Sequence, residues 1–481
     1  MGVLSKLEPG KVFEYFEQIC QIPHGSGNEE GISNYLVDFA KEHGLEHYQD
    51  AAHNVIIIKE ASAGYEDVAP VIIQGHMDMV AVKEAGCDID LKKDPLRLCV
   101  EGDTVFAKGT SLGGDDGIAV AYALAVLSDE SIAHPRLEVV ITTDEEVGMY
   151  GANVIDLSML KGRRLLNIDS EEEGILTVGC AGGLRVYSTL PVKREQRQGI
   201  ALRVRLHGLQ GGHSGAEIHK QRGNSNCLMG RLLYGMLDIS DYGIRTLEGG
   251  TKDNVIPLDT EAVIVVDGSA EAEVLAYLKQ YEETLKKELV KKDPGVCITV
   301  EKQSEGTYDC LDAVSVKRVA QLLTVTPNGV QEMSADIPGL VETSLNLGIL
   351  KLTENALTMT QSIRSSVASE KEALKKKVSA VTEMAGGSVE YQGDYPAWEY
   401  QPDSKLRETM IEIYEAMYGR KPKVEVIHAG LECGLLSAKL PGLDCVSFGP
   451  DLTDIHTVNE KLHIASAKRT YEYLLKILAH K

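Results

Sequence analysis

Short apolar runs alternate with amphipathic segments through the first third of the chain. Residues 12–22 and 29–42 carry apolar positions at helical spacing, whereas 54–58 and 70–74 are short β-rich runs. The alternation continues through residue 168. A regular exchange of strand and helix patterns predicts an α/β domain with a doubly wound sheet.

The pattern changes from about residue 187. Alternating strand patterns and charged helical patterns follow one another as in an α+β domain. They lie at 202–206, 226–237, 262–266, 270–292, 314–323, 356–363 and 369–385. We therefore predict an inserted domain over 187–395. The first domain then comprises 1–186 and 396–481, because the last candidate site residue, His456, belongs with those near the N-terminus.

Four apolar runs are each followed by residues that can bind a metal. His76 and Asp78 follow one run, the pair Glu145 and Glu146 follows 137–142, Asp169 follows 165–168, and His456 follows 445–448. A histidine and an aspartate at the end of a single strand are usually only solvated. Their repetition at four strand ends, where open α/β sheets place their ligand sites, indicates a functional site.

A glycine-rich segment, KGTSLGGDDGI at 108–118, supplies further carboxylates. Its glycines permit a tight turn before the apolar stretch 118–127, so that Asp115 and Asp116 fall at the entrance to a predicted helix. Aspartate is a preferred N-cap residue, so capping and metal binding are both open. One carboxylate can cap the helix while the other binds.

The candidate ligands are two imidazoles and three carboxylates: His76, Asp115, Glu146, Asp169 and His456. This mixture of nitrogen and oxygen suits zinc, with cobalt or manganese as substitutes, and is a poor match to magnesium or calcium. Five ligands exceed what one catalytic zinc normally takes. Two ions per subunit, bridged by one carboxylate and a water, account for the excess.

Two acidic residues near these ligands have other expected roles. Adjacent residues do not easily direct both carboxylates at one metal, so we assign Glu145 as the general base that activates the bridging water. His76 and Asp78 are two apart and point the same way on an extended segment. We expect Asp78 to hydrogen-bond His76 and fix its tautomer.

The amino-acid composition limits the classes of binding partner and the cellular compartment that we expect. The 72 acidic residues outnumber 49 basic ones, giving a formal net charge of −23, which disfavours nucleic acid and anionic membranes as partners. The nine cysteines contain no CxxC pair and suggest buried thiols in a reducing cytoplasm. The sequence shows no signal-peptide pattern and no apolar run near the ~20 residues of a membrane span. We expect a soluble cytoplasmic protein whose partners are small solutes or proteins.

Several strings resemble a known family in order and spacing. They are GHMDMV, TSLGGDDGI, TTDEEVG, NIDSEE and DIHTVNE, joined in the inserted domain and beyond by HGLQGGHSG, TKDNVIP, VETSLNLG and HAGLECG. The ordered set resembles the aminoacylase and carboxypeptidase family of co-catalytic zinc metallopeptidases. Within it, the chain is most similar to the cytosolic aminoacyl-histidine dipeptidases, also called Xaa-His or carnosinase-like dipeptidases. The similarity covers essentially the whole chain.

The resemblance implies a role for each matching residue. His76 and His456 would be terminal ligands of different metals, and Asp115, the first of its pair, would be the bridge in preference to Asp116. The inserted domain would be a lid and dimerisation domain, which implies a homodimer. The resemblance further implies the roles of Glu146 and Asp169 as remaining ligands, Asp78 as orienting acid, Glu145 as base, His213 as oxyanion donor, and Asn254, Arg364 and Gly430 in substrate binding. Glu432 stays unassigned.

The expected function is a two-metal dipeptidase for unblocked dipeptides. A preference for Xaa-His, such as β-alanyl-histidine, follows from the resemblance alone, whereas Arg364 is a natural clamp for a terminal carboxylate because its planar fork binds both oxygens. A tripeptidase, a broad dipeptidase and an N-acyl amino acid deacylase are alternatives with the same metal site. A noncatalytic binding protein of the same fold is a further alternative, which intact Glu145 and Asp78 disfavour.

Overall fold

The apolar runs flanking the candidate ligands form the centre of an eight-stranded sheet. The computed structural model describes residues 2–335 and 337–481. The strand order is β1 (Glu46–Gln49), β2 (Val55–Lys59), β6 (Leu137–Thr142), β3 (Val71–His76), β7 (Arg164–Asn167), β21 (Asp444–Ser447), β8 (Ile175–Cys180) and β20 (Lys423–Ile427). The four central strands, β6, β3, β7 and β21, are parallel. Their carboxyl ends therefore meet at one edge.

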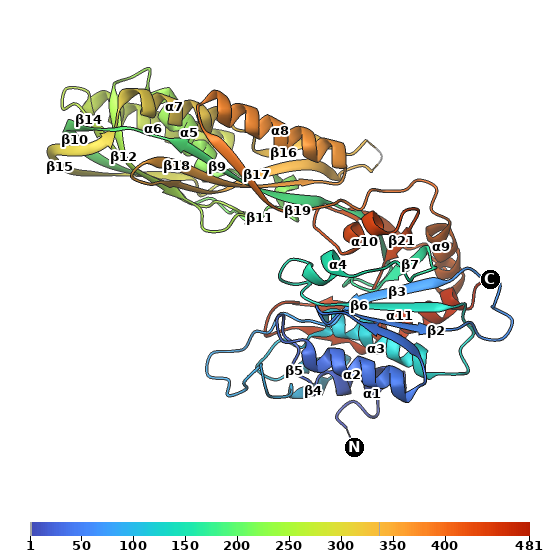
Figure 1. Cartoon of the computed structure of the whole chain (residues 1–481). Coiled ribbons are helices and arrows are strands. Elements are labelled where there is room, and N and C mark those ends of the chain that lie inside the picture. The colour runs from blue at the N-terminus through green and yellow to red at the C-terminus, as the bar shows by residue number, and fades with distance from the viewer. Residues whose placement is uncertain (1, 336) are drawn as a thin grey trace. The chain divides into compact units, whose positions relative to one another are not determined.

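Helices cover both faces of this sheet, which explains why its central strands are apolar runs without alternation. Figure 1 shows α2 (Glu30–Glu42) and α3 (Gly114–Ser128) on one face, and α4 (Tyr150–Val154) and α10 (Cys433–Lys439) on the other. The remaining helices of this part are α1 (Gly10–Ile19), α9 (Lys405–Tyr418) and α11 (Ile464–Leu478). A second, four-stranded sheet has the order β22 (Leu452–Thr453), β23 (Lys461–His463), β5 (Thr104–Ala107) and β4 (Leu98–Glu101).

Helix α3 is apolar on every side and is buried from Gly114 to Leu127. A helix without a polar face requires neighbours all round. Phe16 of α1 lies against Gly117, where an added Cβ would come within 3.3 Å of its ring, and the Tyr122 hydroxyl donates to the Ala467 carbonyl of α11. The N-terminus of α3, which carries Asp115 and Asp116, is thus held inside the molecule.

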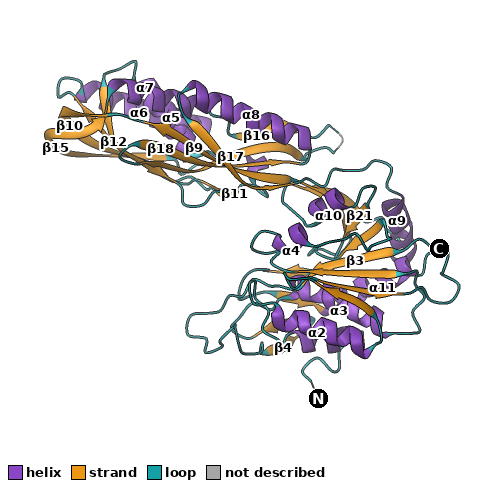
Figure 2. Cartoon of the chain, in the orientation of Figure 1, coloured by secondary structure: helices purple, strands orange, loops and turns teal. Residues whose placement is uncertain are grey.

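The long alternating strands form an antiparallel sheet of nine strands. Its order is β15 (Cys297–Leu311), β10 (Arg194–His207), β14 (Thr260–Val266), β12 (Tyr242–Gly249), β17 (Val341–Leu352), β18 (Ala356–Ser365), β9 (Gly182–Pro191) and β19 (Ser388–Tyr395), with β16 (Gly329–Met333) beside β17. Four helices pack on one face, as Figure 2 shows: α5 (Ser225–Met236), α6 (Glu271–Glu288), α7 (Ala313–Val325) and α8 (Ala368–Met384). A short pair, β11 (Gly212–His213) and β13 (Val255–Ile256), and the 3-10 turn Ile218–Lys220 complete this part.

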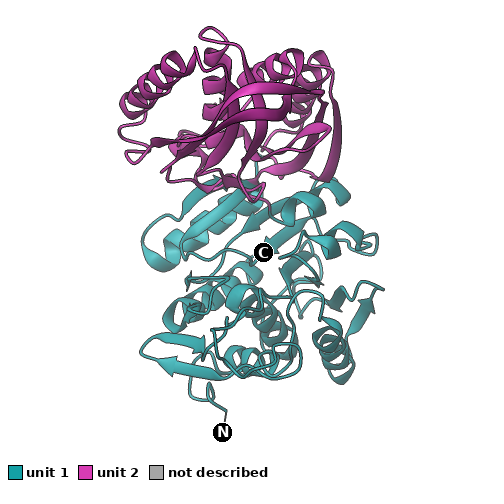
Figure 3. Cartoon of the chain, turned by 90° about the vertical axis from the view of Figure 1, so that its left-hand side faces the viewer, with its two compact units in different colours: residues 1–179, 400–426, 431–481 teal, residues 180–399, 427–430 magenta. Residues whose placement is uncertain are grey.

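The chain divides into two compact units, coloured separately in Figure 3. Unit 1 comprises 1–179, 400–426 and 431–481, and unit 2 comprises 180–399 and 427–430. The predicted boundaries, 1–186, 187–395 and 396–481, differ from these units at residues 180–186, 396–399 and 427–430. The amide of Ala181 hydrogen-bonds the carbonyls of Ile427 and Ala429, so this short segment is held by the start of unit 2.

The predicted fold class is confirmed. The predicted strand at 137–142 matches β6, and the predicted helix at 369–385 lies within one residue of α8. The doubly wound pattern is incomplete, however, because β1, β2 and β8 pair antiparallel with their neighbours. All nine cysteines are free thiols. Within the described residues, no helix combines the length and the apolar character that crossing a membrane requires.

A buried polar network ties the central strands together beneath their carboxyl ends. The carboxylate of Glu432 accepts hydrogen bonds from Gln74 Nε2 at 2.5 Å and Thr142 Oγ1 at 2.6 Å, through the same oxygen. Asn167 Nδ2 donates to Gln74 Oε1 at 2.6 Å. All four side chains are fully buried. Glu432, which the sequence left unassigned, therefore links α10 to β3, β6 and β7.

The buried carboxyl of Glu432 generates a stability prediction. Burial raises the pKa of Glu432 from 4.5 to about 8. Because the folded state keeps its proton while the unfolded chain loses it, stability falls as pH rises between these two values. We expect Glu432→Gln to remove this loss of stability. Measured in the presence of a chelator, the urea midpoint of the variant should decline less than that of the wild type as the pH rises from 4.5 to about 8. Glu172→Gln, an exposed glutamate, is the control, and parallel curves for Glu432→Gln and wild type would contradict the prediction.

Candidate active site

Three of the five predicted ligands lie at the carboxyl edge of the central strands in unit 1. His76 is the last residue of β3, Asp169 follows β7, and Glu146 follows β6. His76 and Asp169 are buried, at 1% and 9% exposure. Adjacent parallel strands explain this grouping, because each strand delivers its next residues to the same edge.

Asp115 lies between the two predicted histidine ligands. Its Oδ1 is 3.3 Å from His76 Nε2, and its Oδ2 is 3.1 Å from His456 Nε2. His456 Nε2 is also 2.9 Å from Glu146 Oε1, and His76 Nε2 is 3.6 Å from Asp169 Oδ1. Each oxygen of Asp115 therefore faces a different imidazole, which is the arrangement that a bridging carboxylate requires. The five predicted ligands come together in one cluster.

The donor set of this cluster fits bound cations. His76 Nδ1 lies 3.0 Å from the carbonyl oxygen of Asp78, so it carries the proton in the neutral ring and Nε2 is a lone pair. That lone pair faces oxygens of Asp115 and Asp169, whose hydrogen bonds raise the pKa of His76 well above its usual value against the effect of burial. The position therefore favours a positive charge, which a proton or a bound cation can supply. His76 with Asp115 and Glu146, and His76 with Asp116 and Asp169, each group their ligand atoms within 4.8 Å.

The pKa shifts of the clustered residues also indicate a site for bound cations. Hydrogen bonding to Asp115 and to Glu146 raises the pKa of His456 to about 10. Burial raises the pKa of Asp169 to about 6, and the carboxylates of Asp115 and Glu146 contribute to this shift. Three buried carboxylates against two imidazoles leave an excess of negative charge, which divalent cations bound by these oxygens and nitrogens would neutralise.

Asp78 has contacts beyond those predicted. Its carboxylate lies 3.4 Å from His76 Nδ1, farther than its own carbonyl oxygen. The carboxylate oxygens accept hydrogen bonds from the amides of Glu145 at 3.0 Å and Glu146 at 3.3 Å, and from Ser26 Oγ at 2.8 Å. Asp78 thus fixes the backbone of the loop that carries the predicted base and one predicted ligand. No sequence pattern indicated this contact.

Glu145 lies in the same cluster as a largely buried carboxyl group. Burial raises its pKa well above the usual value, and Asp169, Glu432 and Glu146 raise it further while His76 opposes them. A carboxylate that binds protons more strongly than usual is suited to general-base work. The assignment of Glu145 as base remains a prediction.

The expectation that Asp115 or Asp116 caps the following helix is wrong. Helix α3 has Gly113 at its N-cap and no side-chain cap from that position. Asp116 is turned instead toward β3, where its Oδ2 accepts a hydrogen bond from the His76 amide at 3.2 Å. Asp116 is 2% exposed and holds the backbone of a predicted ligand.

A second group of predicted residues lies in unit 2. His213 Nδ1 accepts hydrogen bonds from the amides of Gly215 at 3.2 Å and Ala216 at 3.1 Å. Nε2 must then carry the proton of the neutral ring. Burial lowers the pKa of His213, and Arg364 lowers it further. A neutral imidazole with an N–H at Nε2 is the donor that the predicted oxyanion contact requires.

Arg364, Gly430 and two unpredicted residues lie near His213. Arg364 Nη1 is 3.2 Å from the Tyr395 hydroxyl, and Arg364 Nε is buried with no hydrogen-bond partner among the described residues. An added Cβ at Gly430 would come within 2.9 Å of the Tyr395 ring. His428 bonds Ser344 Oγ at 2.7 Å through Nε2, and burial together with Arg364 lowers its pKa to about 3.

Asn254 belongs to the same part of unit 2 through its backbone. Its carbonyl accepts a hydrogen bond from the Ser214 amide at 2.8 Å, next to His213. Asn346 Nδ2 holds the neighbouring carbonyls of Asp253 and Val255. The structure therefore groups the four predicted unit 2 residues, and adds Tyr395 and His428. His428 lies two residues before Gly430 in the string HAGLECG, and this proximity in the sequence could have indicated that His428 belongs to the site.

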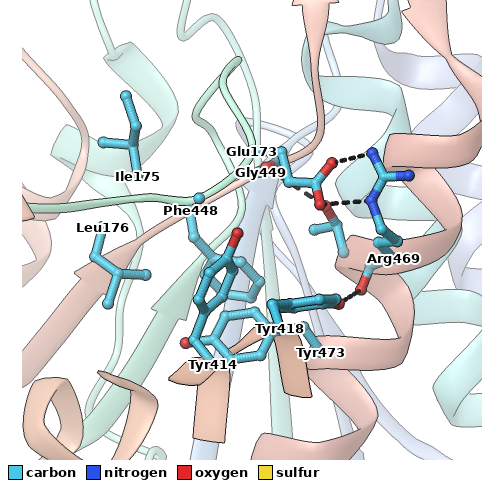
Figure 4. A pocket seen from close by; sticks show the side chains of 11 residues that line it. Glu173, Ile175, Leu176, Tyr414, Tyr418, Phe448, Gly449, Arg469 and Tyr473 are labelled. Carbon is cyan, nitrogen blue, oxygen red and sulfur yellow. Dashed lines mark hydrogen bonds and ion pairs between the residues drawn. The ribbon is translucent and has the colours of Figure 1, made fainter. Parts of the chain in front are cut away.

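An aromatic pocket in unit 1 is lined by none of the predicted site residues. Figure 4 shows Tyr414, Tyr418 and Tyr473 beside Phe448, with Glu173 paired to Arg469. The two nitrogens of the guanidinium lie 2.7 and 2.6 Å from the carboxylate. The cavity holds about 10 Å³, which is room for roughly one water. It is too small for a peptide, and we read it as packing between α9 and α11.

Comparison with known proteins places the chain. Its sequence is 38% identical over 480 residues to the cytosol non-specific dipeptidase of Escherichia coli (strain K12), covering 99% of each chain. Its structure matches the aminoacylhistidine dipeptidase from Vibrio alginolyticus with a TM-score of 0.93 and 37% identity, covering 99% of this chain and 97% of the other. Aminopeptidase PepT from Bacillus cereus ATCC 10987 shares the fold at a TM-score of 0.57 and 15% identity, covering 98% of each chain.

The family assignment rests on most of the chain. Residues 72–480 match the sequence profile of peptidase family M20/M25/M40, a stretch that begins within β3 and includes every predicted ligand. The resemblance inferred from the motifs is thereby confirmed. The chain belongs to peptidase family M20/M25/M40.

Proposed function

We propose that the chain is a dipeptidase that uses two metal ions, preferably zinc, to hydrolyse unblocked dipeptides and favours Xaa-His substrates such as β-alanyl-histidine. One observation carries the proposal: the two oxygens of Asp115 face two separate imidazoles, those of His76 and His456, in a buried carboxylate cluster. The relatives named dipeptidases at 38% and 37% identity support the reaction class.

The proposed ligands of the two ions are His76, Asp115, Glu146, Asp169 and His456, with Asp115 shared. When bound, such ions polarise the scissile carbonyl and make a water more acidic. The chain's own residues arrange this chemistry. Asp78 holds the amides of Glu145 and Glu146, and the carbonyl of Asp78 fixes the proton of His76 on Nδ1.

Glu145 is the proposed base. Its carboxylate accepts a proton from the attacking water and passes it to the nitrogen of the leaving amine. His213 is the proposed donor to the negative charge that develops on the substrate oxygen, through its Nε2 proton. Arg364 is the proposed clamp for the dipeptide's terminal carboxylate, and Asn254 and Gly430 are proposed to border the bound substrate. The buried and unpartnered Nε of Arg364 supports this role.

Further parts of the proposal concern assembly and location. We propose that unit 2 supplies the lid and the dimer contact of a homodimer, as the family resemblance implies. A cytoplasmic location is supported by the name of the Escherichia coli relative. The high negative charge supports small peptides as substrates and disfavours polyanionic partners such as nucleic acid and anionic membranes.

A broad dipeptidase is the second candidate, favoured by the words "non-specific" in the name of the Escherichia coli relative. It would share the metal site and differ only in tolerance of the C-terminal residue. Tripeptidase activity has weaker support, because the solved structure named as a tripeptidase, from Staphylococcus aureus, is 15% identical and shares the fold alone. The deacylase alternative stays a prediction, which an acetylated substrate tests.

A substrate panel tests the reaction class. We expect hydrolysis of β-alanyl-histidine and of alanyl-histidine, with higher kcat/KM for Xaa-His than for size-matched dipeptides, and much slower turnover of a tripeptide and an N-acetyl amino acid. Release of the free amino acid, followed by chromatography, is the measurement. Equal rates on all unblocked dipeptides would favour the broad dipeptidase. Preferred cleavage of the acetylated substrate would overturn the proposal.

Metal removal and substitution of the base test the mechanism. We expect chelation to abolish turnover and zinc, manganese or cobalt to restore it.

Glu145→Gln should lower kcat by about 10²-fold or more while metal content, measured by elemental analysis, stays that of the wild type. Glu172→Gln, an exposed glutamate in the loop after Asp169, should leave both unchanged. A Glu145→Gln protein with near-normal turnover would show the base assignment to be wrong.

Arg364 offers a test of carboxylate recognition. We expect Arg364→Ala to raise KM for a dipeptide by about tenfold or more, since a hydrogen-bonded charge pair is lost. The same variant should barely change the rate on the corresponding dipeptide amide, which lacks the carboxylate. Arg203→Ala, on β10 of the same sheet, is the control. If dipeptide and dipeptide amide lost activity equally, Arg364 would not be the clamp.

A further inference from the structure

The glycine-rich loop that carries Asp115 wraps around a carboxylate from the C-terminal part of unit 1. Glu460 Oε2 accepts hydrogen bonds from the amides of Leu112 at 2.8 Å and Gly113 at 3.1 Å. Glu460 Oε1 accepts from the amides of Gly114 at 2.8 Å and Asp115 at 3.3 Å. Glu460 is 3% exposed. One buried side chain thus satisfies four consecutive backbone donors.

These donors belong to the turn at the start of α3, which precedes a kink at Asp115 and Asp116, whose backbone angles are not helical. The first amides of a helix have no partner within it, and a local side chain usually satisfies one or two of them. Gly113 at the N-cap has no side chain to do so. Glu460, distant in the sequence, binds these amides in place of a local side chain and so fixes the turn that leads into the kink. A helix start buried in the protein interior would otherwise leave these donors unsatisfied.

The glycines permit this close contact. Gly113 has φ of +68°, which is costly for residues with a side chain. At Gly114 an added Cβ would lie 2.7 Å from Leu452 Cδ2 and 3.3 Å from Glu460 Oε1. The loop therefore follows the shape of the carboxylate that it encloses. The path of this loop sets the position of the Asp115 backbone.

The segment that supplies Glu460 also supplies His456. Strands β22 and β23 pair as a hairpin, with Leu452 opposite Leu462, and residues 454–460 form the connection between them. Glu460 directly precedes β23, and His456 lies farther along the same connection. The hairpin is therefore joined to the glycine-rich loop twice: by Glu460 to the backbone, and by His456 to Asp115 Oδ2 at 3.1 Å.

We infer that Glu460 is a positioning residue for the metal centre, which sets the orientation of Asp115 and its distance from His456 by binding the four amides of the preceding loop. The inference rests on the proposed function, because it assumes that Asp115 and His456 bind metal. The hydrogen bonds of Glu460 go to backbone amides and not to the side chain of a proposed ligand. Glu460 acts through the backbone of one ligand and the hairpin of another.

A buried glutamate elsewhere in unit 1 provides a matched control. Glu138 on β6 is fully buried, accepts hydrogen bonds from the amides of Lys161 at 3.0 Å and Gly162 at 2.9 Å, and pairs with Arg136 Nε. Like Glu460 it holds backbone donors with both oxygens. Unlike Glu460, it contacts no loop that carries a predicted ligand within the part of the chain that the structure describes. Glu138→Gln therefore reports the general cost of replacing a buried, amide-bound carboxylate.

The test compares Glu460→Gln with Glu138→Gln by cobalt binding to metal-free protein. In Glu460→Gln a side-chain NH₂ replaces one oxygen and faces two amide donors, so we expect cobalt affinity to fall by about tenfold or more, with a changed visible absorption spectrum. Reloaded with excess metal, it should show a lower kcat and little change in KM. Glu138→Gln should lose thermal stability but keep wild-type cobalt affinity, spectrum and kcat.

Equal cobalt affinities for Glu460→Gln and the wild type would overturn the inference. So would equal losses of affinity in Glu460→Gln and Glu138→Gln, because these would indicate general destabilisation. If Glu460→Gln does not accumulate as folded protein, Glu460→Asp is measured with the same criteria, since it keeps the charge but shortens the reach by one methylene. Cobalt binding needs no substrate, so a wild type that binds cobalt yet hydrolyses no peptide would contradict the proposed function alone.

Discussion

The structure depends on the convergence of buried carboxylates on two imidazoles. Asp115, Glu146 and Asp169 bring their oxygens to His76, which is buried, and to His456, whose side chain is 45% exposed. Like charges held this close are stable only with compensating positive charge. The rest of unit 1 holds these side chains together. Parallel strands end at one edge of the sheet, and backbone donors keep the loops in place.

Acidic side chains act in this protein as much on backbone amides as on the proposed metals. Asp78 binds the amides of the Glu145 loop, Asp116 binds the amide of His76, and Glu460 binds the amides that lead to Asp115. A carboxylate with several N–H donors fixes a loop more firmly than a single side-chain contact. This arrangement explains why the glycine-rich segment and the HTVNE segment need their particular residues, and why carboxylates outside the predicted ligand set are buried beside it.

Much of the fold and of the site could be predicted because local chemistry controls them. Apolar runs such as 137–142 form strands wherever both faces are buried, and the polar residues that follow them collect at one edge. The role of Asp116 was beyond prediction, since the choice between capping, binding and holding β3 depends on which group lies opposite. The place of residues 427–430 in unit 2 was beyond prediction for the same reason: their partner, Ala181, lies far away in the sequence.

The sequence by itself determined the family, the order of strands and helices, and the set of residues able to bind metal, because these follow from residue type and short-range spacing. Only the tertiary structure decided the partners of each charged group. It placed the two oxygens of Asp115 toward different histidines, put Glu460 at the start of α3, and brought Tyr395 and His428 beside Arg364 and Gly430. Such pairings join segments distant in the chain, and they depend on packing and desolvation that no local pattern contains.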